Sequence, residues 1–260
     1  MSLPSLTAGE YMLVYNMLSF TIAAMGASFA FFIMGQQRVA PKYRISLIVS
    51  SLVVGIAAYH YFRIFGSWQG AYTLVEGAYV ATGVAFNDAY RYVDWLLTVP
   101  LLLVELVLVL SLARDKSGPM LTKLGIAAFL MIALGYPGEI MAHSDKVLFG
   151  GYGFWGTASS IPFFYILYIL WTELGEAIKG QPERVGVLFR NMRLLLIFTW
   201  GFYPIVYCLP FFGLDATQAV VSIQVGYAIA DVLAKAGYGV MIYAIAREKS
   251  LADGWSESKA

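Results

Sequence analysis

Five ionisable side chains interrupt stretches of sequence that are otherwise strongly apolar. Arg91, Asp94 and Glu105 lie in one such stretch, and Asp231 and Lys235 lie one helical turn apart in another. Ionisable groups inside apolar helices are costly and by default mark a functional site. A neutral primary amine condenses with an aldehyde, and the imine can be protonated again if Asp94 and Asp231 stay ionised beside it. The residues therefore favour a ligand bound to Lys235 as an imine, with two carboxylate counterions.

The spacing along the first stretch predicts a relay of groups that carry protons. In a helix that rises about 1.5 Å per residue, Asp94 and Glu105 lie roughly 16 Å apart on one face, which Thr98 shares. The depth of Lys235 falls between the two carboxyl groups. The alternative is that these charges only pair to hold helices together.

Aromatic side chains near the charges predict a binding slot. Trp95 follows Asp94, and a second stretch carries Trp200, Tyr203, Pro204 and Tyr207 at offsets of three, four and seven. Such a stripe is more often ordinary core. Beside a buried lysine it indicates a flat slot for an elongated apolar ligand, because aromatic rings bury a large area at little entropic cost.

These residues must be positioned by helices that cross a lipid bilayer. The 260-residue chain is 60% hydrophobic and 13% charged, and a span needs about 20 apolar residues. We expect an all-α membrane protein, with residues 1–260 as a single domain of seven transmembrane helices. A short hairpin is expected over the outer mouth, between Trp68 and Ala85. The predicted spans are Leu6 to Met34, Tyr43 to Gly66, Asp88 to Leu112, Met120 to Ala142, Phe154 to Ile178, Val187 to Phe212 and Gln218 to Ala246.

The distribution of basic residues predicts the orientation. Thirteen of the seventeen Lys and Arg residues fall on alternate connections and on the tail, where Arg247, Lys249 and Lys259 are counted. Basic residues near span ends are retained in the cytoplasm. The N-terminus is therefore expected outside the cell and the C-terminus in the cytoplasm.

Several classes of function have no support in the composition. A formal net charge of +1 gives no indication of nucleic-acid binding. Cys208 is the only cysteine, which excludes a cysteine metal cluster, so we expect no metal. No nucleophile with a base is evident, and we do not expect an enzyme.

Three motifs resemble those of the microbial rhodopsins, and within them the proteorhodopsin and xanthorhodopsin branch of outward proton pumps. They are RYVDWLLTVPLLLVE from Arg91 to Glu105, WGFYP from Trp200 to Pro204 and DVLAKAGYG from Asp231 to Gly239. Their order and their places in the predicted spans match the family over essentially the whole chain.

The resemblance implies a role for each matching residue. Lys235 would bind all-trans-retinal as a protonated Schiff base, with Asp94 as primary counterion and proton acceptor and Asp231 as second counterion. Glu105 would be the cytoplasmic proton donor. Arg91 would stabilise the counterion region on the side where protons leave. The retinal pocket would be lined by Trp95, Leu102, Trp200, Tyr203, Pro204 and Tyr207, with Thr98 beside Asp94.

The ion-determining triad of the family is Asp94, Thr98 and Glu105 here, which is the proton-pump form. The resemblance therefore implies a light-driven ion transporter in the plasma (inner) membrane of a prokaryote. One alternative is a photosensory rhodopsin without net transport, although a complete relay argues against it. A cofactor-free transporter or receptor with a structural lysine is the other, and colour after addition of retinal would distinguish it.

His60 has two interpretations. A lone histidine on an apolar helix is usually a packing residue. However, His60 and Asp94 each lie about six residues from the outer end of a predicted span, so they could meet at one level. In the proteorhodopsin branch, a histidine hydrogen-bonds the counterion and adjusts its pKa, and removing it should shift the pH of the colour change.

The branch suggests further properties. Gly156 stands where many relatives carry a bulky tryptophan. It either eases helix packing or, as in the xanthorhodopsin branch, opens a window for a carotenoid antenna. Leu102 matches a leucine associated with green absorption, and members of the branch commonly form pentamers. The segment before Asp231 lacks the acidic residue of the bacteriorhodopsin release pair, and Glu139 and Asp145 are expected to be solvated loop carboxylates.

Overall fold

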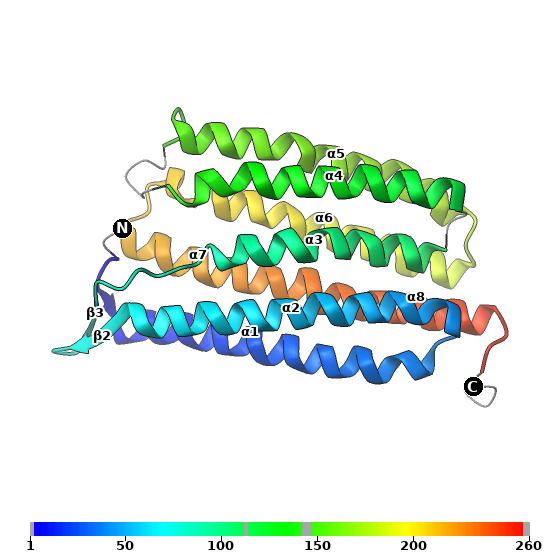
Figure 1. Cartoon of the computed structure of the whole chain (residues 1–260), viewed down its shortest axis with the longest axis horizontal. Helices are drawn as coiled ribbons and strands as arrows, with labels where there is room; N and C mark the ends of the chain where they lie inside the picture. The colour runs from blue at the N-terminus through cyan, green and yellow to red at the C-terminus, as the bar shows by residue number, and fades with distance from the viewer. Residues whose placement is uncertain (1–2, 112–113, 142–146, 257–260) are drawn as a thin grey trace.

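Seven long apolar helices form a bundle in the computed structural model, which describes residues 3–111, 114–141 and 147–256 (Figure 1). The first strand lies at one end of the bundle and the last helix terminates at the other, as an odd number of crossings requires. The prediction of seven apolar spans is confirmed. The helices are α1 (Ala8–Gly35), α2 (Pro41–Ala71), α3 (Tyr90–Leu110), α4 (Arg114–Glu139), α5 (Gly151–Lys179), α6 (Glu183–Tyr207) and a last rod of α7 (Ala216–Asp231), the π-helical turn η4 (Val232–Gly237) and α8 (Tyr238–Ala252).

The outer surface of the bundle is apolar, as a lipid-facing surface requires. Large side chains such as Phe62, Phe164 and Phe198 are exposed on α2, α5 and α6. In lipid, such side chains gain nothing by turning inward, and helices associate through close packing and polar contacts instead. The interior of the bundle is therefore free to hold the polar residues.

Most helices are longer than the predicted spans, because hydropathy detects only the part that crosses hydrocarbon. Pro41 begins α2 at a position that suits proline. Ser111 adopts a left-handed conformation that ends α3. The sixth helix ends at Tyr207 and not at Phe212, with a 3-10 turn, η3 (Leu209–Phe212), after it. The predicted span ends Leu112 and Ala142 lie outside the described residues, as do Asp145 and Lys259.

A small antiparallel sheet caps one end of the bundle. The hairpin of β2 (Tyr72–Val75) and β3 (Ala78–Ala81) lies within the predicted segment, and β1 (Leu6–Thr7) adds to β3. Two predictions were wrong here. Leu6 belongs to a strand, because a capping box between Thr7 and Glu10 starts the helix at Ala8, and Trp68 belongs to α2, which runs on to Ala71.

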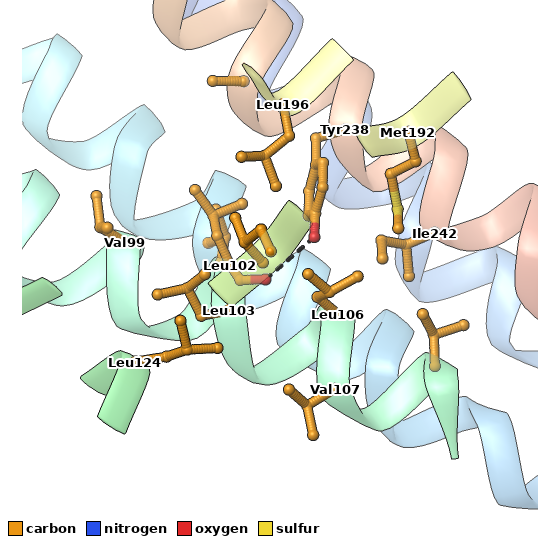
Figure 2. Packing of buried hydrophobic residues seen from close by; sticks show 14 of the residues in the cluster. Val99, Leu102, Leu103, Leu106, Val107, Leu124, Met192, Leu196, Tyr238 and Ile242 are labelled. Atoms are coloured by element: carbon orange, nitrogen blue, oxygen red, sulfur yellow. Dashed lines mark hydrogen bonds between the residues drawn. The ribbon is translucent and has the colours of Figure 1, made fainter. Parts of the chain in front are cut away.

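The C-terminal half of α3 packs into a layer of apolar side chains. Figure 2 shows Leu102, Leu103 and Leu106 of α3 among side chains from α4, α6 and α8. The hydroxyl of Tyr238 donates a hydrogen bond of 3.3 Å to the carbonyl of Leu102, drawn as a dashed line (Figure 2). This layer surrounds the helical turn that carries Glu105.

Lys249 was expected on the tail beyond the last span, but it belongs to the last helix. It lies in α8, is buried, and its amine donates hydrogen bonds to the carbonyls of Val109 (2.9 Å) and Leu110 (3.0 Å). These carbonyls belong to the last turn of α3, where backbone oxygens lack helical partners. Lys249 therefore caps α3 from the neighbouring helix.

Candidate functional site

The centre of the bundle holds one amine between two carboxylates. Lys235 lies in the π-helical turn η4 and is only 2% exposed, while Asp94 and Asp231 are fully buried. The amine of Lys235 donates to Asp94 Oδ2 and lies 3.1 Å from Asp231 Oδ2. Breaking a buried pair of this kind costs about 3–5 kcal/mol, because it leaves a charge without a partner. The structure thus brings together the three residues on which the sequence argument depended.

Asp231 is fixed by donors from three helices. Tyr61 of α2 donates at 2.8 Å, Trp95 of α3 donates through its indole nitrogen at 3.1 Å, and Tyr203 of α6 donates to Oδ1. Each donor stabilises the ionised carboxylate. These three hydrogen bonds therefore fix the position of Asp231 beside Lys235.

Asp94 is less constrained than Asp231. Its Oδ2 accepts from Lys235, whereas its Oδ1 has no hydrogen-bond partner among the described residues. A carboxylate with a free oxygen next to an amine has room to accept a proton. The two carboxylates thus differ in the number of side-chain donors that hold them.

His60 lies at the level of Asp94 but does not hydrogen-bond it. The distance from His60 Nδ1 to Asp94 Oδ1 is 3.9 Å, which is too long, and the same nitrogen lies 3.0 Å from the carbonyl of Ile56. The expected proximity holds, while the expected hydrogen bond is absent. The ring nitrogen pairs instead with the backbone carbonyl one turn earlier in α2.

Arg91 and Thr98 flank Asp94 along α3. The guanidinium of Arg91 is buried, lies 5.6 Å from the ring centres of both Tyr61 and Tyr227, and interacts electrostatically with Asp231. The hydroxyl of Thr98 donates to the backbone carbonyl of Asp94 at 2.8 Å and not to its carboxylate. Thr98 is therefore adjacent to Asp94, as expected, without binding its carboxylate.

Glu105 is buried away from the central charges. Its Oε2 accepts from the hydroxyl of Ser50 on α2, and its Oε1 has no partner among the described residues. Tyr238 of α8 also interacts with it electrostatically. No ion pair to Glu105 is present in the described part of the chain, which suits a carboxyl group that carries its proton.

A cavity of about 230 Å³ begins at Lys235 and runs between α3, α4, α5 and α6. All six residues predicted to line a pocket lie on its wall: Trp95, Leu102, Trp200, Tyr203, Pro204 and Tyr207. Tyr92, Met131, Leu148, Phe163 and Phe211 also line it. The site can hold an elongated apolar molecule whose end reaches the lysine amine.

Gly156 lies on the same wall, where α5 approaches α6. A Cβ atom at this position would come within 2.7 Å of Cε1 of Tyr207, so any larger residue would displace that ring. Tyr207 is itself stacked on Tyr152, with ring centres 4.2 Å apart. Gly156 therefore permits a close approach beside the cavity.

Three contributing residues were missed by the sequence argument. Tyr61 follows His60 directly, and Tyr227 lies one turn before Asp231, yet tyrosines are common in this chain and neither spacing is distinctive. Ser50 carries no charge and so did not enter a search for ionisable groups. A search for polar residues at helical spacing on the second span would have found Ser46 and Ser50 together.

Comparisons with known proteins agree with this arrangement. The model of the family described as bacteriorhodopsin-like protein matches residues 13–249. The chain is 32% identical over 241 residues to the green-light absorbing proteorhodopsin of a gamma-proteobacterium, covering 91% of this chain and 88% of that one. It is 59% identical to a crystal structure of xanthorhodopsin, described as a light-driven ion pump with dual chromophore, with a TM-score of 0.92 over 98% of this chain and 100% of that one. A crystal structure of thermophilic rhodopsin is 52% identical, with a TM-score of 0.91 over 97% and 100%.

Proposed function

The chain belongs to the microbial rhodopsin family, and we propose that it is a light-driven pump that moves protons out of the cell. The observation that carries the proposal is the buried contact between Lys235 and Asp94, at the end of an aromatic cavity and with a second buried carboxyl group, Glu105, on the same helix. Net transport needs a proton acceptor on one side of the amine and a donor on the other. This chain has a candidate for each.

The cavity fits retinal as the cofactor. Its wall is formed mainly by rings and aliphatic side chains, and Lys235 supplies the amine for an imine bond. Bound retinal would supply light absorption and an isomerisation that changes the position of the nitrogen-bound proton. Trp95 and Trp200 would confine the polyene, and Tyr203 would connect the wall to Asp231.

The chain's own residues divide the proton chemistry between them. Asp94 would take up the proton, since its Oδ1 accepts no hydrogen bond from the residues that the structure describes. Asp231 would remain charged, because three donors hold it. Arg91 would stabilise negative charge on the exit side, and Glu105 would supply the replacement proton from the cytoplasmic half.

The direction of transport follows from the proposed orientation. We place the N-terminus outside the cell and the C-terminus in the cytoplasm, on the basis of the basic residues on alternate connections. In this orientation Asp94 lies towards the outside and Glu105 towards the cytoplasm. The protein would reside in the plasma (inner) membrane of a prokaryote, with a pentamer as the favoured assembly.

A carotenoid antenna is a further part of the proposal. Gly156 lies on the cavity wall, and Phe154, Ile161 and Phe164 of the same helix expose apolar surface nearby in the sequence. A flat apolar molecule on this surface could approach the retinal site through the space that Gly156 leaves. The description of xanthorhodopsin as a pump with dual chromophore supports this idea.

The decisive test measures the external pH of illuminated cells that express the chain with added retinal. Outward pumping predicts acidification that is abolished both by a protonophore and by Asp94→Asn. A coloured protein that moves no protons would instead favour sensing or another ion. Absence of colour would refute retinal binding.

A further inference from the structure

A line of polar groups follows the inner face of α2 from Glu105 to the end of the bundle. Ser50 donates to Glu105 and also lies 3.1 Å from the carbonyl of Ser46, one turn earlier. The hydroxyl of Ser46 in turn donates to the carbonyl of Tyr43 at 2.7 Å. All three side chains on this face, Tyr43, Ser46 and Ser50, are buried. Buried polar groups at membrane depth are costly, so a series of hydroxyl groups on successive turns of one helix calls for a functional reason.

The line ends at a carboxylate that reaches solvent. The hydroxyl of Tyr43 donates to Asp253 Oδ2 at 2.7 Å, and the amine of Lys42 lies 2.9 Å from the same oxygen. The side chain of Asp253 is 39% exposed. Asp253 therefore joins the aqueous phase to the buried hydroxyl of Tyr43.

The neighbouring space at this end of the bundle, between α8 and α3, is filled. Lys249 occupies the space between α8 and the last turn of α3, where it donates to Val109 and Leu110. Its amine also lies 5.2 Å from the ring centre of Tyr43. The side chain of Lys249 thus takes up the carbonyl groups at the end of α3, whereas the hydroxyl groups of Tyr43, Ser46 and Ser50 line the inner face of α2.

From this geometry we propose that protons reach Glu105 along α2, entering at Asp253 and passing Tyr43, Ser46 and Ser50. The inference rests on the proposed function, since it describes how the donor of that pump recovers its proton. A proton from cytoplasmic water would bind Asp253 transiently and move past the hydroxyl groups, with ordered water between them, to the carboxylate that Glu105 leaves after donation. Lys42, Tyr43 and Lys249 face Asp253, while Ser50 and Tyr238 face Glu105.

The serines could have a purely structural role, and the chain contains a control for it. A serine hydroxyl in a helix often bonds to a carbonyl one turn earlier. Ser51 does this, donating to the carbonyl of Ile48 at 2.7 Å, and its hydroxyl makes no hydrogen bond to Glu105. A structural role would make Ser51→Ala and Ser50→Ala similar. A role in proton uptake would separate them.

The experiment uses the purified full-length pigment, excited by a flash, with a pH-indicating dye in solution. Ser50→Ala, Ser46→Ala and Asp253→Asn should each slow proton uptake and recovery of the dark pigment by about three- to tenfold, the effect of losing one hydrogen bond. The delay should grow as the pH rises, because the cytoplasmic side then supplies fewer protons to a route that has lost one of its groups. Two controls should behave like the wild type. Ser51→Ala is the control for Ser50→Ala. Glu248→Gln is the control for Asp253→Asn, since it removes one carboxylate charge near the end of α8, the helix that carries Lys249.

A second measurement does not depend on turnover. In the dark pigment, the infrared carbonyl band of protonated Glu105, assigned with Glu105→Gln, should shift to higher frequency in Ser50→Ala and stay in place in Ser51→Ala. Ser46→Cys serves if Ser46→Ala does not fold. Wild-type uptake rates in both the Ser46 variant and Asp253→Asn would overturn the route, even if Ser50→Ala were slow. Failure of the pump proposal itself would be visible earlier, as a wild-type protein without light-driven proton release.

Discussion

Tyr61 donates a 2.8 Å hydrogen bond to the same oxygen of Asp231 that lies 3.1 Å from the amine of Lys235. One carboxylate oxygen thus joins the second helix to the last one at the proposed retinal attachment site. This relationship makes Tyr61 part of the counterion structure, although it carries no charge. It also explains why the centre of the bundle can hold two acidic groups beside a single lysine without disorder.

Tyr61→Phe should retain colour but lower stability. The change removes one donor to a buried carboxylate, which costs about 1–3 kcal/mol. The midpoint of thermal bleaching, followed by visible absorbance, should therefore fall. Tyr59→Phe is the matched control, because Tyr59 is exposed and its hydroxyl only accepts from Arg63. Equal midpoints for the two variants would contradict the role assigned to Tyr61.

Lys235→Ala should abolish the pigment. Without the amine no imine can form, and two buried carboxylates lose their shared partner at a cost of about 3–5 kcal/mol. Visible absorbance after addition of retinal to membranes measures the result. Lys116→Ala, which changes an exposed lysine on α4, should leave the colour intact. A coloured Lys235→Ala protein would refute the attachment site.

Gly156→Trp should prevent energy transfer from an added carotenoid while leaving the retinal pigment. The larger side chain would occupy the space next to Tyr207, where even a Cβ atom comes within 2.7 Å of the ring. Excitation spectra of retinal fluorescence, recorded with and without carotenoid, measure the transfer. If the wild type shows no carotenoid contribution, Gly156 serves helix packing only.

The Asp253 contacts should make stability depend on acid pH. Burial opposes the charge of Asp253, but the hydrogen bonds from Lys42 and Tyr43 outweigh it and lower the pKa of Asp253 below its ordinary value. A carboxylate with a lowered pKa stabilises the fold above its unfolded pKa of about 3.9 and loses that contribution as the pH falls through the folded pKa. Because both charged side chains are more than one third exposed, the contribution should stay below about 1 kcal/mol.

The variant Asp253→Asn tests this dependence. Its bleaching midpoint should lie slightly below that of the wild type at neutral pH. The difference should shrink as the pH falls below about 3.9 and vanish once the pH has passed the lowered pKa of folded Asp253, where the carboxyl group is protonated in both states. The bleaching midpoints of Glu248→Gln and the wild type should show no such pH-dependent difference. A constant difference between wild type and Asp253→Asn at every pH would show that packing, and not charge, is responsible.

The helices and the central residues could be predicted because their signals are strong and local. Runs of apolar residues define spans, and charges within them stand out, so Asp94, Glu105, Asp231 and Lys235 were found from the sequence alone. Span ends were less certain, because caps such as the Thr7 and Glu10 pair depend on side-chain geometry that hydropathy does not measure.

Contacts between helices could not be predicted in the same way. Depth predicted that His60 and Asp94 lie at one level, and the resemblance to proteorhodopsins implied a hydrogen bond between them. Neither fixes which partner a ring nitrogen selects. Lys249 was counted on the tail because it follows the last predicted span in the sequence, whereas the last helix continues to Ala252 and buries it. Such errors arise where rotation about a helix axis, and not position along it, decides the contact.

The π-helical turn at Lys235 has a consequence for the whole last rod. A single π turn accommodates one residue more than an α turn, and one residue corresponds to about 100° of rotation in an α-helix. The helix after Gly237 is therefore out of phase with the helix before Val232, so one helical wheel drawn through residues 216–252 would assign the wrong faces to α8. Deleting one residue within 232–237 would restore a regular phase and rotate Lys249 and Ser250 away from the partners they now bind on α3 and next to α2.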